Sequence, residues 1–235
     1  MIIPALDEAE VIGRVVTEMR AALPPGLAGR IVVVDNGSTD ATSLVAARAG
    51  AEVVFEPRRG YGRACAAGVA AAVGAEYLVF LDGDGADLPG DLTRILEPIV
   101  NAGAELVVGV RRRREYRSMT PWQLLGNRLA AGVIQVLYGV RVGDLGPFRA
   151  IRRADLMALD MTEMTYGWST EMVVKCLRAG LRYREVEVGY RRRVGVSKVG
   201  GTLAGSVRAG VSILGTAFAY SRWMLPDGQG EGARS

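Results

Sequence analysis

Short apolar runs and longer amphipathic segments alternate along the first half of the chain. The short runs have the length and β-branched composition of buried strands, and they cover residues 31–34, 52–55, 77–81 and 106–110, after a clipped first run at 2–3. The segments between them have helical periodicity, with Gly or Pro near their ends, and cover residues 8–23, 39–49, 62–73 and 88–102. This alternation predicts an α/β fold in which a mostly parallel, Rossmann-like sheet is flanked by helices.

The pattern changes after about residue 115. It then predicts a long helix at 121–138, a short strand at 148–152, a helix at 169–179 and a half-buried strand at 183–190. No linker divides these segments, so we expect a single domain over 1–202, with a nucleotide-binding half at 1–115 and an acceptor half at 116–202. Beyond it we expect an apolar helix at 203–224 and a disordered tail at 225–235.

Carboxylates follow directly after the run at 77–81. The segment VFLDGDGAD leads from apolar residues into Asp82, Asp84 and Asp87. Ligands of open α/β sheets bind outside the carboxyl ends of such strands, and two aspartates spaced i, i+2 can share one Mg²⁺ or Mn²⁺ that takes its other oxygens from water and a substrate diphosphate. We interpret Asp82 and Asp84 as such a site; the alternative is an acidic Gly turn with solvated carboxylates. A calcium loop is disfavoured, because Ala86 stands at its third ligand position.

The amino-acid composition excludes several classes of catalytic and metal site. Histidine is absent from the 235 residues, which excludes Ser-His-Asp and Cys-His catalysis, HExxH zinc sites and a His general base. Any reaction must use carboxylates, Arg, Lys, Tyr or a metal ion. The two cysteines, Cys65 and Cys176, lie in apolar, helix-like surroundings, so we expect core residues in a reducing compartment rather than a disulfide.

The net charge of +4 conceals clusters of arginine at 58–59, 111–114, 152–153 and 191–193. Guanidinium groups suit phosphate oxygens. No aromatic residues interleave the runs as a single-strand platform requires, so nucleic acid is not an expected partner.

Targeting and membrane-spanning segments are not predicted. The first ten residues lack the basic start and long apolar core of a signal peptide, so we expect a cytoplasmic protein. The apolar stretch 209–220 has 12 residues, short of the roughly 20 that span a bilayer. Flanked by Arg208, Arg222 and Trp223, it would suit an interfacial helix in peripheral contact with the cytoplasmic membrane face. A helix packed on the domain or on a partner is an equal alternative.

Two further motifs lie at the expected ligand edge of the sheet. Asp35 ends the run IVVVD and precedes NGSTDAT, so its carboxylate either recognises a ribose or base or forms a turn with backbone amides. Gly60 and Gly62 follow the next run and open a helix, where backbone amides could face a phosphate. Cys65 stands at the third glycine position of a dinucleotide fingerprint, so the glycines alone do not identify one.

Taken together, seven ordered motifs resemble the family 2 glycosyltransferases of GT-A fold, in the branch around dolichyl-phosphate mannose synthase and bacterial polyprenyl-phosphate sugar transferases. The motifs are IIPALDEAEVI, VVVDNGSTDAT, RRGYGRACAAG, VFLDGDGAD, VVGVR, GWSTEM and GVSK, and they cover about residues 2–202. The resemblance implies a nucleotide-diphosphate sugar donor, inverting transfer, and Mg²⁺ or Mn²⁺ as cofactor.

The resemblance also assigns site residues. It implies that Pro4, Glu8 and Asp35 contact the nucleoside, and that Asp82 and Asp84 handle the nucleotide diphosphate and the metal. We add the neighbouring Ala5, Gly60, Gly62 and Gly83 to the candidate nucleotide-sugar contacts. Arg111 would match the arginine after the fifth strand, while Asn127 and the segment around Glu171 would line the acceptor side. Four departures stand out: a first strand clipped to residues 2–3, Ala86, a turn at 143–150 that is one residue short, and one residue missing before Ser197-Lys198, so that Arg192 or Arg193 could be the matching arginine.

The nature of the acceptor follows from charge. A phosphate monoester is mostly dianionic at neutral pH, because its second pKa is about 6, so it attacks without a base and needs a cationic cradle instead. Arg111, Arg193, Ser197 and Lys198 could form this cradle, although a solvated basic face is the alternative for each. Glu171 is the candidate base if the acceptor is an alcohol; the alternative is solvation or a salt bridge to a nearby Arg.

A polyprenyl phosphate or another phosphorylated acceptor is therefore our leading expectation. A soluble acceptor and a non-catalytic nucleotide-binding or scaffolding module are the alternatives, and a nicotinamide oxidoreductase comes third. The sequence leaves open the base and sugar of the donor and the oligomeric state, a homodimer included.

Overall fold

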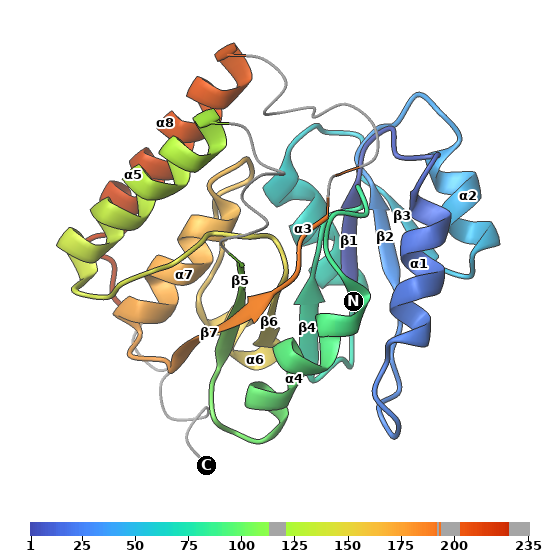
Figure 1. Ribbon diagram of the computed structural model, residues 1–235, viewed down its shortest axis with the longest axis horizontal. Coiled ribbons are helices and arrows are strands. Elements are labelled where there is room, and N and C mark those ends of the chain that lie inside the picture. Colours follow the sequence, from blue (N-terminus) through green and yellow to red (C-terminus); the bar gives the residue numbers. More distant parts are fainter. Residues whose placement is uncertain (113–120, 192, 194–202, 226–235) are drawn as a thin grey trace.

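The computed structural model describes residues 1–112, 121–191, 193 and 203–225, with the backbone alone for 121–127 and 203–209. A seven-stranded sheet with the order β3-β2-β1-β4-β6-β5-β7 crosses the described part, and helices cover both of its faces (Figure 1). Strand β6 pairs antiparallel with β4 and β5, whereas the other pairings are parallel. The predicted α/β fold with a mostly parallel sheet is confirmed.

The strands are β1 (Ile2–Ala5), β2 (Val32–Asp35), β3 (Glu52–Phe55), β4 (Tyr77–Phe80), β5 (Leu106–Arg111), β6 (Arg149–Arg152) and β7 (Tyr183–Val188). The helices are α1 (Ile12–Ala21), α2 (Thr42–Arg48), α3 (Tyr61–Ala71), the 3-10 helix η1 (Pro89–Asp91), α4 (Leu92–Val100), α5 (Pro121–Tyr138), α6 (Arg153–Ala158), α7 (Trp168–Arg178) and α8 (Leu203–Ala219). The hydrophobic pattern predicts each of these except α6, which is a single short helix directly after β6.

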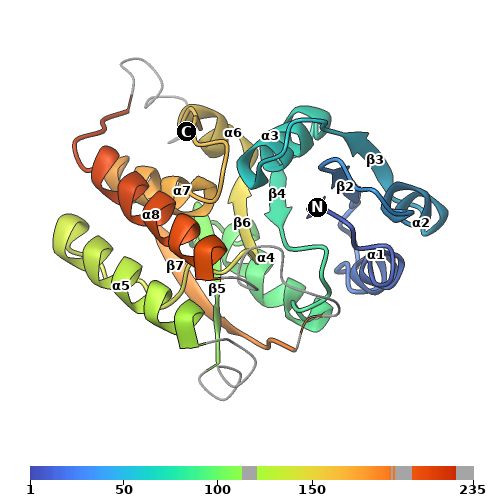
Figure 2. The ribbon, with the colours of Figure 1, turned by 90° about the horizontal axis from the view of Figure 1, so that it is seen from above.

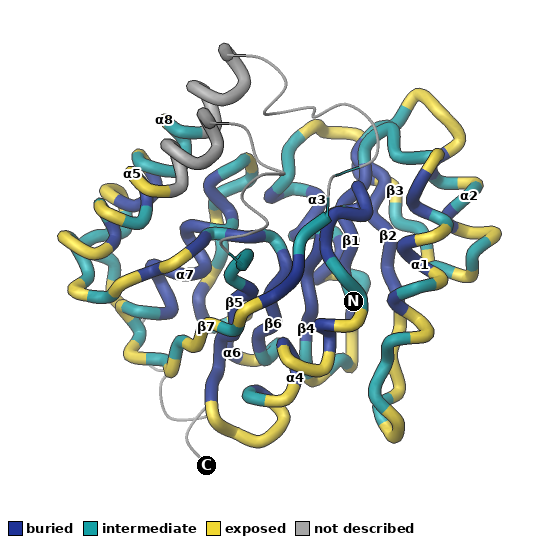
Figure 3. The backbone as a smooth tube through the Cα atoms, viewed as in Figure 1, coloured by how far each residue is buried: buried dark blue, intermediate teal, exposed yellow. Residues whose placement is uncertain are grey.

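The core consists of two apolar layers, one on each face of the sheet. Ile2 and Leu78 lie in the layer with α3 and α7, whereas their neighbours Ile3 and Val79 lie in the layer with α1 and α4. This division follows from the strand geometry, in which successive side chains point to opposite faces. Because both faces are covered, β1, β2, β4 and most of β5 are buried (Figure 3) and appear in the sequence as continuous apolar runs, whereas the edge strands β3 and β7 are partly exposed. Cys65 and Cys176 are buried and free, as expected.

Pro4 lies inside a central strand, where proline is uncommon. The carbonyl of Pro4 accepts the Gly83 amide at 3.3 Å, so its backbone polar groups face the β4 side. Proline has no N–H to donate across that side, and ladder pairing between β1 and β4 is confined to Ile2 and Phe80. The start of β1 therefore pairs with the end of β4, and the residues after Phe80 form a loop at the sheet edge.

Helix α8 packs on the domain through α5 and α7, and the three helices form a layer at one end of the molecule (Figures 1 and 2). The Tyr138 hydroxyl of α5 donates to the Ala217 carbonyl at 2.6 Å. Beyond α8, the rings of Tyr220 and Trp223 lie 4.7 Å and 5.1 Å from the buried Lys175 Nζ of α7. The segment is thus packed on the domain. Within the described residues, none of the helices is long and apolar enough to cross a membrane.

Candidate functional site

Strand direction gathers the candidate residues at one edge of the sheet. The carboxyl ends of β1, β2, β4 and β5 point to the same edge, because these strands are parallel to one another. Strand β6 runs the opposite way, so the residues before it reach this edge, and those after β7 reach it as well. The edge therefore carries Ala5, Asp35, Asp82, Asp84, Arg111, Asp144, Tyr190 and Arg193.

Three aspartates crowd together in the loop after β4. Burial, and then the charge of Asp84, raises the pKa of Asp82 to about 7, against the opposing effects of Arg193 and Arg111. Burial, and then Asp82, raises the pKa of Asp87 well above its usual range. Asp84 is buried, and its Oδ1 accepts the Ala86 amide at 2.9 Å. The loop thus concentrates negative charge where few water molecules can screen it, a setting that favours a bound cation.

Arg193 supplies a positive charge to this loop. Its Nη2 lies 2.9 Å from Asp84 Oδ2 and 3.9 Å from Glu8 Oε1. Its Nε is buried and has no hydrogen-bond partner among the described residues. Of the two arginines that could match the family position, Arg193 is the one found beside the aspartates, and Arg192 lies outside the described residues.

The segment after β7 is fixed to the aspartate loop, which explains the position of Arg193. Asp87 and Tyr190 form an antiparallel bridge, and the Arg191 amide donates to the Ala86 carbonyl at 2.9 Å. The Arg191 side chain donates from Nε to the Gly85 carbonyl at 2.5 Å and from Nη2 to Glu18 at 2.7 Å. Two segments far apart in the sequence therefore form one structural unit.

Arg111, at the end of β5, makes a two-pronged ion pair with Asp144. Its Nε and Nη2 lie 2.5 Å and 2.6 Å from the two carboxylate oxygens, and its guanidinium carbon lies 4.9 Å from the ring centre of Tyr190. Asp144 is buried and Arg111 is largely so. This arrangement locks the side chain of Arg111 at the edge of the site, although Asp144 neutralises much of its charge.

Arg149, at the start of β6, has a different role from Arg111. It is buried and donates to the Ser169 carbonyl at 2.8 Å, the Leu145 carbonyl at 3.1 Å and the Gly146 carbonyl. These bonds tie the turn before β6 to the start of α7. The shortened turn that includes Asp144 is therefore held from both ends.

The nucleoside candidates lie around the ends of β1 and β2. Pro4 and Ala5 are buried in β1, and the Glu8 amide donates to Thr42 Oγ1 at 2.8 Å. Asp35 accepts the Ser38 amide at 2.7 Å and the Ser43 hydroxyl. These bonds are those of a turn-forming aspartate, the second interpretation of Asp35.

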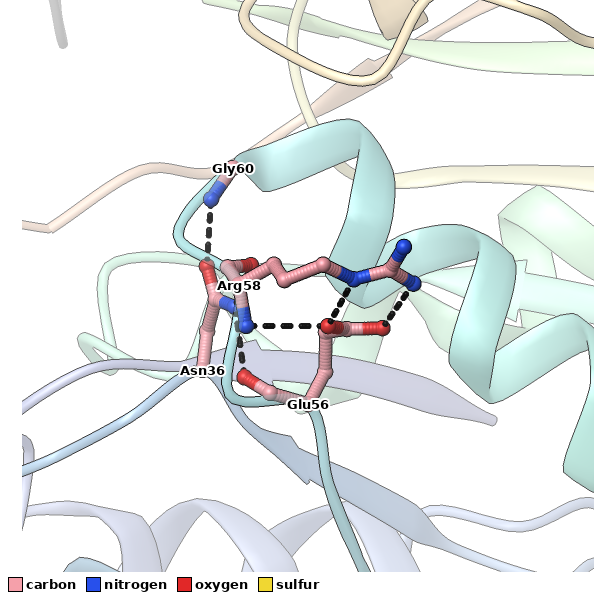
Figure 4. Close-up of polar contacts among 4 residues, drawn as sticks. All are labelled: Asn36, Glu56, Arg58 and Gly60. Atoms are coloured by element: carbon pink, nitrogen blue, oxygen red, sulfur yellow. Dashed lines mark hydrogen bonds and ion pairs between the residues drawn. The ribbon is translucent and has the colours of Figure 1, made fainter.

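Asn36, which follows Asp35, braces the loop between β3 and α3 (Figure 4). Its Nδ2 donates to the carbonyls of Glu56 and Arg58 at 3.0 Å and 2.8 Å, and its Oδ1 accepts the Gly60 amide at 2.8 Å. Within the loop, the Arg58 guanidinium Nε lies 3.0 Å from Glu56 Oε1. One amide side chain thus fixes the path of the chain from β3 into α3.

The amides at the start of α3 differ from what we expected. The Gly60 amide is taken by Asn36, and the Gly62 amide donates to the Thr165 carbonyl at 3.1 Å. A Cβ on Gly62 would lie 2.3 Å from the Glu163 carbonyl oxygen, so the glycine allows the segment before α7 to approach the helix. The expectation that these amides face a phosphate is wrong for this conformation, because protein oxygens occupy them.

Glu171 lies in a buried polar cluster in which both of its carboxylate oxygens have partners. It is fully buried on α7, and its Oε1 lies 2.7 Å from Lys175 Nζ. Its oxygens also accept the amides of Thr162 at 2.9 Å and Glu163 at 2.7 Å. The geometry corresponds to the salt-bridge interpretation, with Lys175 in place of Arg as the partner.

The remaining acceptor candidates cannot be placed. Only the backbone of Asn127 is described, in α5, and Ser197 and Lys198 lie outside the described residues. Gly83, by contrast, is placed: a Cβ there would lie 3.1 Å from the Pro4 carbonyl oxygen. Glycine at this position thus lets the aspartate loop pass close to β1.

The donor set after β4 fits a hard divalent cation. Within the described residues, no group of three or more His, Cys, Asp or Glu side chains could hold a metal ion. Mg²⁺ and Mn²⁺ suit this arrangement, since they accept carboxylate oxygens and complete their shells with water and phosphate. Asp82 and Asp84 would hold such an ion, whose charge would offset the burial and the repulsion from Asp84 that raise the pKa of Asp82.

A family model described as "Glycosyl transferase family 2" matches residues 1–159. The chain belongs to this family. It is 39% identical over 211 residues to an uncharacterized glycosyltransferase of Mycobacterium tuberculosis, covering 89% of this chain and 93% of the relative. It is 30% identical to the undecaprenyl-phosphate mannosyltransferase of Micrococcus luteus, covering 94% of each.

The fold agrees with this family assignment. Glucosyl-3-phosphoglycerate synthase of Mycobacterium tuberculosis, solved with Mn²⁺, UDP-glucose and phosphoglyceric acid, superposes with a TM-score of 0.76 over 97% of this chain and 80% of its own. The two chains are 22% identical, so this likeness shows the fold alone. The glycosyltransferase has the GT-A fold that its motifs imply.

Sequence reasoning overlooked Tyr190 and Arg191 and left the role of Asp144 open. Asp144 was visible as the acid in the motif GDLGPFR, but nothing in that motif names Arg111 as its partner. Tyr190 and Arg191 precede the basic run that includes Arg193, and their importance depends on the bridge to Asp87. Only the three-dimensional pairing of these segments reveals it.

Proposed function

We propose that this glycosyltransferase is a metal-dependent, inverting enzyme that transfers a sugar from a nucleotide-diphosphate sugar to a polyprenyl phosphate. The observation that carries the proposal is the contact between Arg193 and Asp84. It places a guanidinium with a buried, unpartnered Nε directly beside the carboxylates that suit a metal and a diphosphate. A donor diphosphate and an acceptor phosphate would both find complementary charge there.

The donor would lie across the ends of β1, β2 and β4. Asp82 and Asp84 would hold the metal ion, and Glu8 and Asp35 border the space expected for the nucleoside. A bound Mg²⁺ or Mn²⁺ would stabilise the negative charge on the departing nucleoside diphosphate. The structural neighbour with the same fold was solved with Mn²⁺ and UDP-glucose, which is consistent with this use of the fold.

The acceptor is inferred from chemistry and from a relative. An oxygen of the acceptor phosphate would attack the anomeric carbon of the sugar, while the bond from that carbon to the nucleotide β-phosphate breaks. The phosphate is already ionised, so the step needs no histidine base. Arg193 would orient the attacking phosphate, and Arg111 would support it from its fixed position beside Asp144. The Micrococcus luteus relative is named for an undecaprenyl phosphate acceptor.

This mechanism gives no proton-transfer role to Glu171. Both of its carboxylate oxygens already accept hydrogen bonds inside a buried cluster. Its expected part in catalysis would be required only for an alcohol acceptor, which must lose a proton as it attacks.

The first test is thermal unfolding with UDP, GDP, dTDP and their sugars, each with and without Mn²⁺. A ligand that binds the folded state raises its stability by mass action. We expect one nucleotide to raise the melting temperature only with Mn²⁺, and the effect to vanish in Asp84→Asn. Transfer of radiolabelled sugar from that donor to a polyprenyl phosphate in detergent micelles then tests the acceptor.

The outcomes separate the alternatives. Nucleotide binding without transfer or donor hydrolysis would support a non-catalytic module. Transfer to a soluble phosphorylated compound, with none to the polyprenyl phosphate, would support a soluble acceptor. A melting temperature that no nucleotide changes would contradict the donor site itself.

A further inference from the structure

The outer face of the α5–α8 layer carries exposed apolar side chains in a regular arrangement. In the described part of the chain, the large exposed apolar residues include Leu129 and Val136 on α5 and Val211 and Phe218 on α8. Each pair is spaced seven residues apart, so its members lie on the same face of their helix, two turns from each other. Val136 is 84% exposed and Phe218 is 57% exposed. Two neighbouring helices therefore present apolar side chains to the surroundings.

These apolar residues lie on the side of each helix that faces away from the core. Ala130 and Ile134 of α5 and Ala217 of α8 are buried on the opposite sides. The Tyr138 to Ala217 hydrogen bond holds the two helices against each other, and both views of the ribbon show them side by side at the end of the molecule (Figures 1 and 2). The exposed pairs thus belong to one continuous layer, which we call the α5–α8 face.

The charged residues within the two segments that form this face are of one sign. The chain has 25 acidic residues, but none lies within 121–143 or 203–225, the two segments that contain the helices. Basic residues are present in both, and Arg128, Arg141 and Arg222 are exposed. Apolar side chains together with basic residues, and no carboxylates in the same two segments, are complementary to a partner with an apolar interior and a negatively charged boundary.

We propose that the α5–α8 face docks on an anionic lipid bilayer. Val136, Leu129, Val211 and Phe218 would enter the boundary between headgroups and acyl chains, and the arginines would contact anionic headgroups. A second copy of the chain fits this face less well, because two such faces would bring their arginines together with no carboxylate from either helical segment to pair with them, and like charges across an interface are costly. Trp223 is not an anchor in this arrangement, since its ring packs over Lys175.

The inference deepens the proposed function, on which its biological meaning rests, since a polyprenyl phosphate acceptor would lie in such a bilayer. The binding itself needs neither donor nor acceptor. It can therefore be measured separately from sugar transfer.

The chain offers a matched control for the decisive variant. Phe55, on the edge strand β3 and remote from α5 and α8 in the ribbon, is 62% exposed, close to the 57% of Phe218 (Figure 1). Phe218→Asp and Phe55→Asp make the same chemical change at similar exposure, and neither removes a core side chain. Val136→Asp and Val73→Asp form a second such pair, at 84% and 70% exposure.

The experiment is co-sedimentation of the full chain with vesicles of phosphatidylcholine alone or mixed with phosphatidylglycerol. We expect binding to the mixed vesicles that weakens at high salt, and a loss of about tenfold in affinity for Phe218→Asp and Val136→Asp, with Phe55→Asp and Val73→Asp unchanged. Equal binding by all variants, equal loss in all, or no binding to the anionic vesicles would overturn the proposal. So would a dimer in light scattering that Phe218→Asp dissociates.

Sugar transfer in detergent micelles distinguishes the two proposals. There Phe218→Asp should act at the rate of the unaltered protein, because micelles present the acceptor without a bilayer. If the protein binds vesicles through this face but transfers no sugar to a polyprenyl phosphate, the docking surface stands and the proposed function fails.

Discussion

Nη2 of Arg193 lies 2.9 Å from Oδ2 of Asp84 and joins the end of the last strand to the loop after β4. The other oxygen of Asp84 accepts the Ala86 amide. A divalent ion that binds at Oδ2 must therefore share this oxygen with the guanidinium or displace it. Displacement would leave the positive charge of Arg193 available to the acceptor phosphate.

Removal of this arginine should have opposite effects on metal binding and on transfer. In Arg193→Gln the carboxylate loses its competing cation, so Mn²⁺ affinity without nucleotide should rise about three- to tenfold. The transfer rate should fall about 100-fold, because an oriented charge on the reacting phosphate is lost. Mn²⁺ titration by electron paramagnetic resonance and steady-state kinetics check the two effects. Arg30→Gln, which alters an exposed pair with Glu52, should change neither; weaker Mn²⁺ binding in Arg193→Gln would contradict competition.

The raised pKa of Asp82 predicts a dependence of stability on pH. Its value of about 7 in the folded protein exceeds that of an unfolded aspartate, about 3.9. The folded state thus binds the proton more tightly, so this contribution to stability is complete below about pH 4 and is lost as pH rises through 7.

Asp82→Asn removes the titrating carboxylate and should therefore abolish this loss of stability at high pH. Without metal or nucleotide, the variant should melt at least roughly 2–4 °C above the unaltered protein at about pH 8, since each 1 kcal/mol shifts the melting temperature by about that much in a domain of this size, and the difference should shrink toward about pH 5. Calorimetry across this range measures it. Because Asp82 is also a proposed metal ligand, the stabilised variant should be inactive. If Asp82→Asn were less stable than the unaltered protein at every pH, the ionised Asp82 carboxylate would not be the group that lowers stability at high pH.

A substitution of Glu171 distinguishes a structural role of this residue from a catalytic one. Glu171→Gln removes the charge that faces the buried Lys175, and breaking such a pair costs about 3 kcal/mol or more. Urea unfolding should show this loss. The turnover number, measured well below the melting temperature, should stay within about threefold, whereas loss of a general base would lower it by about 100-fold or more. Glu52→Gln, at an exposed pair, serves as the control for stability.

The sequence predicted most of the fold because the central strands β1, β2, β4 and β5 are mostly runs of apolar residues buried on both faces of the sheet. It predicted the position of Asp82 and Asp84 for the same reason, since the place where such a run ends is visible in the chain. The partners of these residues were not predictable in this way. Arg193 meets Asp84 only because β7 lies at the far end of the sheet and its following segment crosses back to Ala86, which no local pattern encodes.

Glycine motifs were ambiguous for a physical reason. Gly60 and Gly62 are equally suited to a close phosphate and to a close peptide carbonyl, because both uses require only the absence of Cβ. Here Met164 supplies the carbonyl beside Gly60, and Glu163 and Thr165 supply those beside Gly62. The segment before α7 is distant in sequence, so the choice between the two uses depends on tertiary packing.

The ion pair of Arg111 and Asp144 forms at the site because of the strand order of the sheet. Strand β6 runs antiparallel to β5, so the turn before β6 delivers Asp144 beside the end of β5, where the carboxylate receives both Nε and Nη2 of Arg111. Asp144→Asn would leave the guanidinium without its countercharge and should destabilise the fold by about 3 kcal/mol in urea unfolding.

Arg111→Lys keeps the charge but cannot form the two-pronged contact, so it should lower turnover about tenfold or more while Mn²⁺ binding, which involves Asp82 and Asp84, is maintained. Equal losses of Mn²⁺ affinity and turnover in Arg111→Lys would instead mean that the pair supports the aspartate loop rather than the acceptor.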